Sequence, residues 1–128
     1  MQDQSRAVLI VDDDEGTADT FARMLRLEGY RVLTARSAEA GFRELEASHP
    51  DAILVDLAMP VMGGIEFLRR LRGREEYSDT PVAVITGDYS LGEQILSELR
   101  ALKADVYFKP VWVDDLLGIA KRLLQGMD

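Results

Sequence analysis

Short apolar runs alternate with amphipathic segments along the whole chain, and this alternation constrains the fold more than any other feature of the sequence. The apolar runs are bounded by turn-forming and charged residues, as buried strands are. They lie at about 7–11, 30–35, 51–56, 81–86 and 105–109. After each run, apolar residues recur at helical spacing, which predicts a helix. The expected helices cover about 14–28, 37–48, 64–72, 91–102 and 113–125.

Five strands and five helices in strict alternation predict an α/β fold with a parallel sheet and helices on both faces. Right-handed crossovers leave few strand orders open. We expect the doubly wound order 2-1-3-4-5, a flavodoxin-like three-layer sandwich. The chain has 128 residues and no internal repeat, low-complexity tract or linker, so residues 1–128 are expected to form one domain.

Several residues mark where the helices begin and end. The Ser37 hydroxyl can cap the second helix, and Gly29 is placed to end the first. Pro60 and the Gly63–Gly64 pair end the third strand and turn the chain into the next helix. That helix is expected to bury a stripe made by Ile65, Leu68 and Leu71.

Charge and composition exclude several classes of function. The formal net charge of −8 argues against binding of nucleic acid or of an anionic membrane. The absence of cysteine excludes a disulfide framework, a thiol nucleophile and a thiolate metal site. No apolar run approaches the roughly 18 residues of a membrane span, and the polar start at residues 1–5 is not a signal peptide. These features predict a cytoplasmic domain.

Polar side chains stand at the carboxyl ends of four of the expected strands. The first strand delivers Asp12 and Asp13, the third Asp56, the fourth Thr86 and the fifth Lys109. In the order 2-1-3-4-5 these four strands are neighbours, and ligands of such sheets bind beyond the carboxyl ends of the strands. We therefore expect the five side chains to lie together at one rim of the sheet.

The residue types at this rim predict phosphoryl chemistry. Neighbouring carboxylates repel one another unless a cation joins them, and Mg²⁺ prefers carboxylates, water and phosphate oxygens as ligands. Lys109 and Thr86 suit the oxygens of a transferring phosphoryl group. Asp56 is then the expected nucleophile, giving an aspartyl phosphate.

Four motifs make the chain resemble a response-regulator receiver domain, over essentially its whole length. They are Val8–Asp13, Leu54–Pro60 with Gly64, Val84–Thr86 and Phe108–Pro110. The resemblance implies that Asp56 accepts a phosphoryl group from a phosphohistidine on a sensor kinase or phosphotransfer protein.

The resemblance also implies roles for the other rim residues. Four oxygen donors would position Mg²⁺: the carboxylates of Asp12, Asp13 and Asp56 and the backbone carbonyl of Ala58. Thr86 and Lys109 would contact the phosphoryl oxygens. The Lys109–Pro110 peptide would be cis, which proline tolerates at a cost of about 0.5–1 kcal/mol. Such a chain is a signalling receiver that catalyses only its own phosphorylation and dephosphorylation.

The sequence departs from the family pattern three residues before the lysine, where an aromatic residue commonly swings inward on phosphorylation. Here that position is Val106, followed by Tyr107 and Phe108. Either the fifth strand is shifted, with Tyr107 taking the role, or the aromatic switch is missing. We favour the second, because a one-residue slip moves side chains to the opposite face.

Two further positions vary within the family and tune the access of water to the phosphoryl group. They lie two residues after Asp56 and Thr86, and here they are Ala58 and Asp88. Ala58 is small and blocks little, whereas Asp88 would disfavour anionic partners.

An interaction surface is expected on the last two helices and the fifth strand, which related receivers use to dimerise or to bind targets. Trp112 is a candidate anchor there, because aromatic residues are favoured as interface hot spots. The alternative is that Trp112 lies over Pro110 and the end of the last helix. The other candidates on this surface are Leu91, Leu96 and Leu116.

Two other functions compete with the receiver hypothesis. Phosphatases with an aspartyl nucleophile resemble one another in carrying a general-acid aspartate two residues after the nucleophile. This chain has Ala58 at that position, which counts heavily against a phosphatase. A pseudo-receiver that serves only as a docking or dimerisation module would leave the acidic, threonine and lysine set without a purpose. The chain ends directly after the last expected helix, which fits a stand-alone receiver and equally a piece of a longer regulator.

Overall fold

The computed structural model describes residues 6–59 and 61–125. The polar start, Pro60 of the expected turn and residues 126–128 lie outside the described residues. Five parallel strands form one sheet in the order β2-β1-β3-β4-β5, which confirms the predicted fold class and topology. The strands are β1 (Ala7–Val11), β2 (Arg31–Ala35), β3 (Ala52–Val55), β4 (Val82–Thr86) and β5 (Ala104–Phe108).

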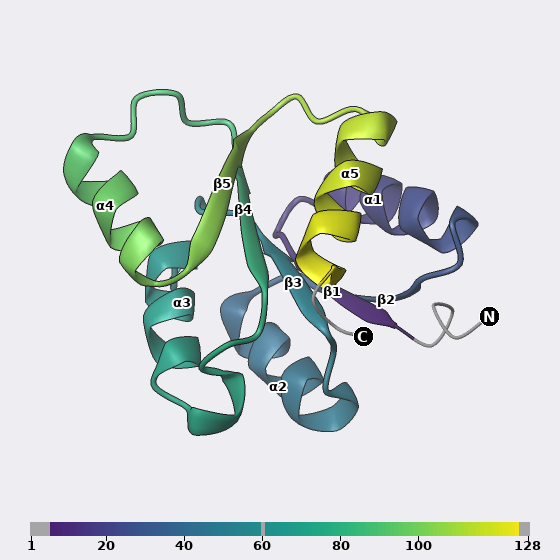
Figure 1. The fold of residues 1–128 in the computed structure, drawn as a ribbon, viewed down its shortest axis with the longest axis horizontal. Coiled ribbons are helices and arrows are strands. Elements are labelled where there is room, and N and C mark those ends of the chain that lie inside the picture. Colours follow the sequence, from purple (N-terminus) through teal and green to yellow (C-terminus); the bar gives the residue numbers. More distant parts are fainter. Residues whose placement is uncertain (1–5, 60, 126–128) are drawn as a thin grey trace.

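Helices cover both faces of this sheet, as the alternation predicts (Figure 1). They are α1 (Glu15–Leu27), α2 (Ala38–Ser48), α3 (Gly64–Arg72), α4 (Glu93–Ala101) and α5 (Val113–Leu124). Helices α1 and α5 pack on one face and α2, α3 and α4 on the other, so the core consists of two apolar layers. A short 3-10 helix, η2 (Glu75–Tyr77), lies in the loop between α3 and β4 and was not predicted.

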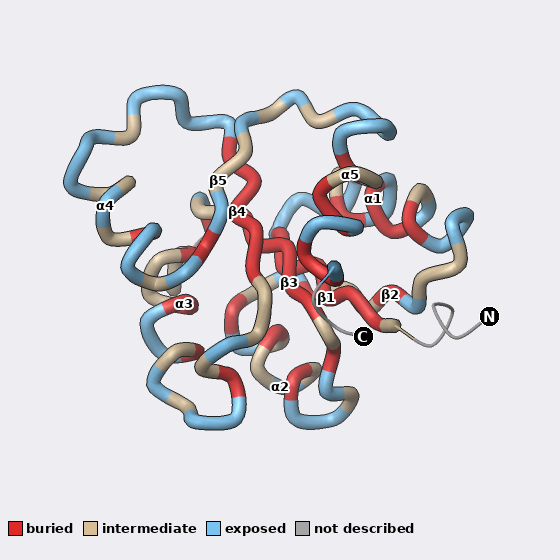
Figure 2. The backbone as a smooth tube through the Cα atoms, viewed as in Figure 1, coloured by how far each residue is buried: buried red, intermediate tan, exposed pale blue. Residues whose placement is uncertain are grey.

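The centre of the sheet is buried from both sides. All residues of β1, β3 and β4 are buried, and these strands form the red centre of Figure 2. The edge strands β2 and β5 mix buried, half-buried and exposed residues. This is the arrangement in which continuous apolar runs are stable as parallel strands.

The expected helix boundaries agree with the structure at several positions. The Ser37 hydroxyl accepts a hydrogen bond of 3.1 Å from the Ala40 N–H and caps α2. Gly29 follows α1 with φ 98°, a conformation that suits glycine. Helix α4 differs, because it begins at Glu93 and leaves Leu91 in the preceding loop.

The buried stripe of α3 contains Leu68 and Leu71 as predicted, but Gly64 and Phe67 take the place of Ile65. Gly64, Phe67, Leu68 and Leu71 are buried, at the spacing that places them on one helix face. Ile65 is only half-buried, because it lies beside this stripe rather than in it.

The Arg72 guanidinium at the end of α3 ties three segments together. It donates to four backbone carbonyls, those of Leu102 (2.7 Å), Tyr77 (2.9 Å), Thr80 (2.8 Å) and Lys103 (3.2 Å). The side chain therefore joins α3 both to the segment before β4 and to the turn between α4 and β5.

Candidate phosphoryl and metal site

The carboxyl ends of β1, β3, β4 and β5 lie side by side and carry the predicted polar residues. Backbone pairing continues one residue past the strands: the N–H of Asp56 donates to the Val11 carbonyl (3.0 Å), and that of Lys109 donates to the Thr86 carbonyl (2.8 Å). This pairing explains why the apolar runs predict strands that reach residues 56 and 109. It also fixes the backbone from which the functional side chains project.

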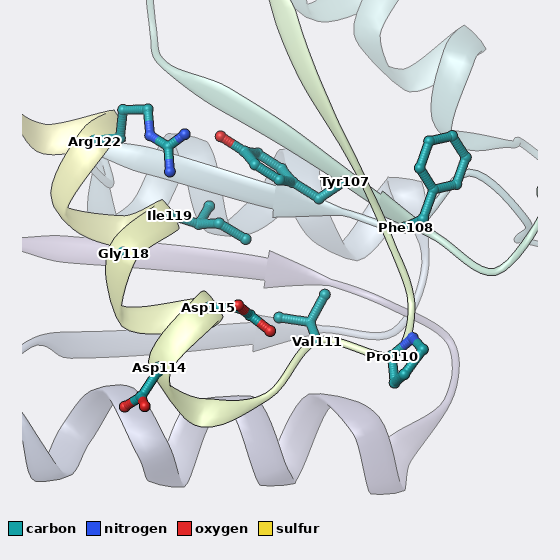
Figure 3. A pocket seen from close by; sticks show the side chains of 9 residues that line it. All are labelled: Tyr107, Phe108, Pro110, Val111, Asp114, Asp115, Gly118, Ile119 and Arg122. Atoms are coloured by element: carbon teal, nitrogen blue, oxygen red, sulfur yellow. The ribbon is translucent and has the colours of Figure 1, made fainter.

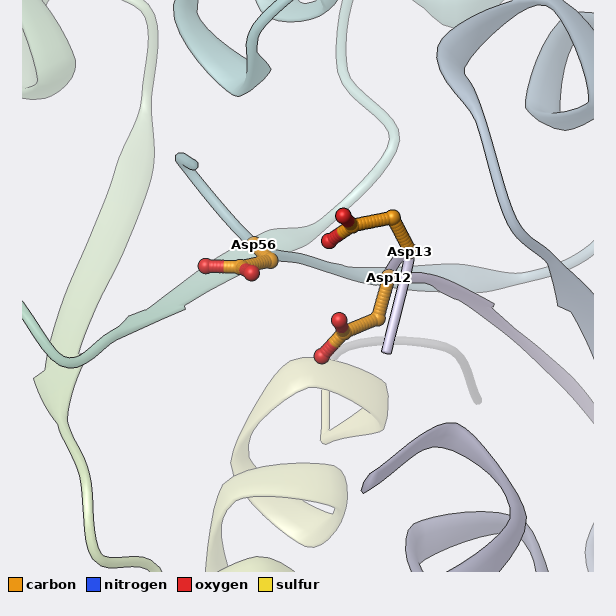
Figure 4. Close-up of side chains that lie close together, drawn as sticks. All are labelled: Asp12, Asp13 and Asp56. Atoms are coloured by element: carbon orange, nitrogen blue, oxygen red, sulfur yellow. The ribbon is translucent and has the colours of Figure 1, made fainter. Parts of the chain in front are cut away.

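Three carboxylates converge at this rim (Figure 4). Asp12, Asp13 and Asp56 each offer one oxygen atom, and these atoms lie within 4.8 Å of one another. Asp12 and Asp56 are buried, with 4% and 8% of their surface exposed, whereas Asp13 is exposed. The sequence prediction that β1 and β3 bring these residues together is therefore correct in its geometry.

Lys109 is the cation beside this cluster. Its Nζ lies 3.8 Å from Asp12 Oδ2 and 3.9 Å from Asp56 Oδ2. Both distances are longer than a good charge-assisted hydrogen bond. The ammonium group therefore lies near both carboxylates without forming a close hydrogen bond to either.

Burial raises the pKa of Asp12 and Asp56 above the ordinary aspartate value, and neighbouring carboxylates push in the same direction. Backbone N–H groups and the Lys109 ammonium oppose this rise. Burial and mutual repulsion thus disfavour the charged form of these carboxylates. A hard divalent cation with oxygen ligands offsets both effects, so these residues fit Mg²⁺.

Thr86 ends β4 beside the cluster and is buried. Its hydroxyl oxygen accepts a hydrogen bond of 3.1 Å from the Asp88 N–H. A hydroxyl can donate while it accepts, so the Thr86 O–H can donate a hydrogen bond to an oxygen atom bound at the rim. Asp88 is exposed, and hydrogen bonds from Ser90 lower its pKa.

The turn after β3 shapes the part of the rim next to Asp56. The N–H of Ala58 donates to Asp56 Oδ1 (3.3 Å), and the small Ala58 side chain is exposed. The Gly64 N–H donates to the Leu57 carbonyl (3.0 Å). A Cβ at Gly64 would lie 2.6 Å from the Asp56 carbonyl oxygen and 2.9 Å from the Leu57 Cα, so no side chain fits there. The sequence indicated only a turn at Gly64 and gave no sign of this close approach.

Strand β5 is not shifted relative to β4. Val106 pairs with Val84, and Tyr107 pairs with Ile85. Val106 packs against the apolar layer of α2, α3 and α4, whereas Tyr107 packs against the layer of α1 and α5. The interpretation that the usual aromatic is missing, rather than displaced by a slip of the strand, agrees with this register. The Lys109–Pro110 peptide is cis, as the resemblance implies.

A pocket of about 430 Å³ lies between the end of β5 and α5 (Figure 3). The Tyr107 side chain points toward Arg122 of α5, and the Phe108 ring points to the other side of the strand (Figure 3). The Arg122 guanidinium carbon lies 5.5 Å from the centre of the Tyr107 ring, within cation–π range.

The residues predicted for the interaction surface differ in their exposure. Trp112 is 68% exposed and directly precedes α5. Its backbone N–H donates to the Asp115 carboxylate (3.0 Å). Leu91 and Leu96 are half-buried. The prediction for Leu116 is wrong, because this residue is fully buried in the layer between α5, α1 and the sheet.

A contact near Lys109 was not predicted. The Tyr89 hydroxyl, from the loop between β4 and α4, donates to the backbone carbonyl of Lys109. The Tyr89 ring stacks on Phe108 with 5.7 Å between ring centres. Loop residues follow no periodic pattern, so the sequence did not indicate that Tyr89 and Phe108 would be in contact.

Among the described residues, no helix is long and apolar enough to cross a membrane.

Comparisons with known proteins agree with this geometry. A family model described as "Response regulator receiver domain" matches residues 8–121. Transcriptional regulatory protein PrrA of Mycobacterium tuberculosis is 34% identical over 121 residues, which cover 94% of this chain and 51% of that protein. Response regulator MprA of the same species is 32% identical over 118 residues, which cover 92% of this chain and 50% of that protein. The chain thus spans about half the length of these curated relatives.

Solved structures share the fold. Chemotaxis protein CheY4 of Vibrio cholerae superposes with a TM-score of 0.86 and 29% identity, covering 94% of this chain and 99% of that chain.

Proposed function

Because this chain belongs to the response regulator receiver domain family, we propose that Asp56 is its phosphoacceptor in two-component signalling. The phosphoryl donor is a phosphohistidine on a sensor kinase or on a phosphotransfer protein. One observation carries the proposal: Asp56, Asp12 and Asp13 present oxygens within 4.8 Å of one another, with the Lys109 ammonium beside them.

In the proposed reaction a carboxylate oxygen of Asp56 attacks the phosphorus atom of the phosphoimidazole. The phosphorus–nitrogen bond breaks, its electron pair leaves with the imidazole nitrogen, and protonation makes the leaving group neutral. The product is an acyl phosphate on Asp56, which carries a charge of about −1.5 to −2 in place of the single negative charge of the carboxylate.

The other rim residues stabilise the transferring group. Lys109 moves its ammonium from the two carboxylates toward the phosphoryl oxygens, and the Thr86 hydroxyl donates to one of them. Mg²⁺, held by Asp12, Asp13, Asp56 and the Ala58 carbonyl, would neutralise negative charge on the carboxylates and on the phosphoryl oxygens. Ala58 has no acidic group, so a phosphatase mechanism with a general acid at this position is not supported.

The proposal extends to the setting of the domain. Residues 1–128 act as one receiver domain in the cytoplasm, supported by a family match that covers most of the chain. The surface formed by α4, β5 and α5, with exposed Trp112, serves a target protein or a second copy of the chain. This domain itself binds neither nucleic acid nor membrane, in keeping with its net charge of −8.

Phosphorylation is tested by incubation with acetyl phosphate and Mg²⁺, followed by intact-mass measurement. We expect a single phosphoryl addition that requires the metal and disappears in Asp56→Asn. Asp19→Asn is the matched control, because Asp19 is an exposed aspartate on α1, and this variant should be phosphorylated like the parent. An unchanged mass of the parent together with absent Mg²⁺ binding would favour the docking-module function.

Dimerisation is tested by size-exclusion chromatography with and without beryllofluoride, which mimics the phosphoryl group. An earlier elution with beryllofluoride is expected for a phosphorylation-driven dimer. An unchanged elution volume would leave a different target protein as the proposed partner of this surface.

A further inference from the structure

Tyr89 contacts the backbone of Lys109 from the solvent side of the molecule. Its hydroxyl donates to the Lys109 carbonyl, and its ring stacks on Phe108 at an angle of 28° between the ring planes. Tyr89 is 69% exposed, so the core does not hold it in place. Its position therefore depends on these two contacts and on its own loop.

The loop that carries Tyr89 is tied to Thr86. The Asp88 N–H donates to the Thr86 hydroxyl (3.1 Å), and the Asp88 carboxylate accepts from the N–H (2.9 Å) and the hydroxyl (2.7 Å) of Ser90. Tyr89 lies between these two hydrogen-bonded residues. A movement of the Thr86 hydroxyl toward a phosphoryl group on Asp56 would thus displace the backbone on the N-terminal side of Tyr89.

Lys109 is held at three points. Its N–H donates to the Thr86 carbonyl (2.8 Å), its carbonyl accepts from Tyr89, and its ammonium lies 3.8–3.9 Å from Asp12 and Asp56. The Tyr89–Lys109 hydrogen bond therefore joins two segments that both contact the rim. The Tyr89 loop is bonded to Thr86, and Lys109 lies beside Asp12 and Asp56.

The face of β5 that meets α4 lacks an aromatic residue at Val106 but has one two residues later. Side chains alternate along a strand, so Phe108 shares the face of Val106, opposite to Tyr107. Figure 3 shows the Phe108 and Tyr107 rings on opposite sides of the strand. The Tyr89–Phe108 stack thus places an aromatic pair at the end of β5, on the face that Val106 shares.

We propose that Tyr89 is a positioning residue for Lys109, and that the Tyr89–Lys109 contact carries the phosphorylation state of Asp56 to the loop before α4. This inference rests on the proposed phosphorylation of Asp56. It assigns to Tyr89 and Phe108 the readout that Val106, an aliphatic residue without a hydroxyl, cannot give.

Tyr89→Phe tests the proposal, because it keeps the ring and removes the hydroxyl. The matched control is Tyr107→Phe, which removes a hydroxyl from the face of β5 opposite to Phe108. The rate of phosphorylation by acetyl phosphate should fall about two- to tenfold in Tyr89→Phe, the range that one hydrogen bond supplies. Mg²⁺ affinity should not change, because the carboxylates are untouched, and Tyr107→Phe should match the parent in both measurements.

The readout is measured by amide chemical shifts of residues 87–91 on addition of beryllofluoride with Mg²⁺. We expect smaller shifts in Tyr89→Phe and in Phe108→Leu, which removes the stacking partner, than in the parent protein or in Tyr107→Phe. Parent-like rates and shifts in Tyr89→Phe would overturn the proposal. So would a parallel loss of Mg²⁺ affinity, since the hydroxyl would then be supporting the structure of the whole rim. Failure of the parent itself to be phosphorylated would instead refute the proposed function.

Discussion

Gly64 offers the sharpest test of how the turn after β3 supports Asp56, the proposed phosphoacceptor. A Cβ at this position would lie 2.6 Å from the Asp56 carbonyl oxygen, and the opposing atom belongs to the backbone rather than to a flexible side chain. An ordinary contact begins near 3.4 Å, so Gly64→Ala requires the backbone of Asp56 or of α3 to move by about 0.8 Å.

This displacement has an expected cost in both stability and rate. Overpacking of this kind costs about 1–3 kcal/mol, of which the replacement of glycine in a helix returns about 0.5–1 kcal/mol. We expect the free energy of unfolding to fall by about 1–2 kcal/mol. A shift approaching 1 Å in a reacting group can cost about a hundredfold in rate, so phosphorylation should slow by about ten- to a hundredfold.

Gly118→Ala is the matched control for this measurement. Nothing lies within 4 Å of a Cβ at Gly118, in the middle of α5. The control should therefore gain about 0.5–1 kcal/mol of stability and keep the parent rate. Urea unfolding gives the stability, and timed intact-mass spectra with acetyl phosphate give the rate. Gly64→Ala with the stability and the rate of the parent would refute the argument from close contact.

Three further predictions concern stability. Burial raises the pKa of Asp12 and Asp56, so without Mg²⁺ the folded state binds protons more readily than the unfolded chain. Their contribution is favourable below the ordinary aspartate pKa of 3.8 and is lost as the pH rises through the raised values. Asp56→Asn should therefore stabilise the metal-free protein more at about pH 7 than at about pH 4, as measured by urea unfolding; an equal effect at both pH values would contradict this. Arg72→Met removes the donor to four backbone carbonyls and should cost about 2–3 kcal/mol, while a loss below about 0.5 kcal/mol would show that water replaces the guanidinium. The Tyr77 hydroxyl is buried without a hydrogen-bond partner among the described residues. Tyr77→Phe should keep or raise the melting temperature, and a clear drop would reveal a partner for the hydroxyl.

The sequence determined the fold and the composition of the rim for one physical reason. In a parallel sheet the ends of the strands meet at one edge, so the residues that follow each apolar run must come together. That rule needs no knowledge of loops, and it gave Asp12, Asp56, Thr86 and Lys109 correctly as neighbours.

What the sequence did not predict depends on loops and on close packing. The space at Gly64 depends on how the turn after β3 crosses α3, and the Tyr89–Phe108 stack depends on a loop with no periodicity. The error at Leu116 has a different origin. Leu116, Ile119, Ala120 and Leu123 recur at the spacing of a buried helix face, so helical geometry favours the core for Leu116 rather than the interaction surface.

Trp112 gives the chain a built-in optical probe. It is the only tryptophan in the sequence, it is 68% exposed, and it stands two residues beyond the cis peptide that follows β5. Its emission spectrum therefore reports from a single segment of the molecule, which begins three residues after Lys109 in the chain. Fluorescence titrations with Mg²⁺, beryllofluoride or a partner protein can follow this segment without any added label.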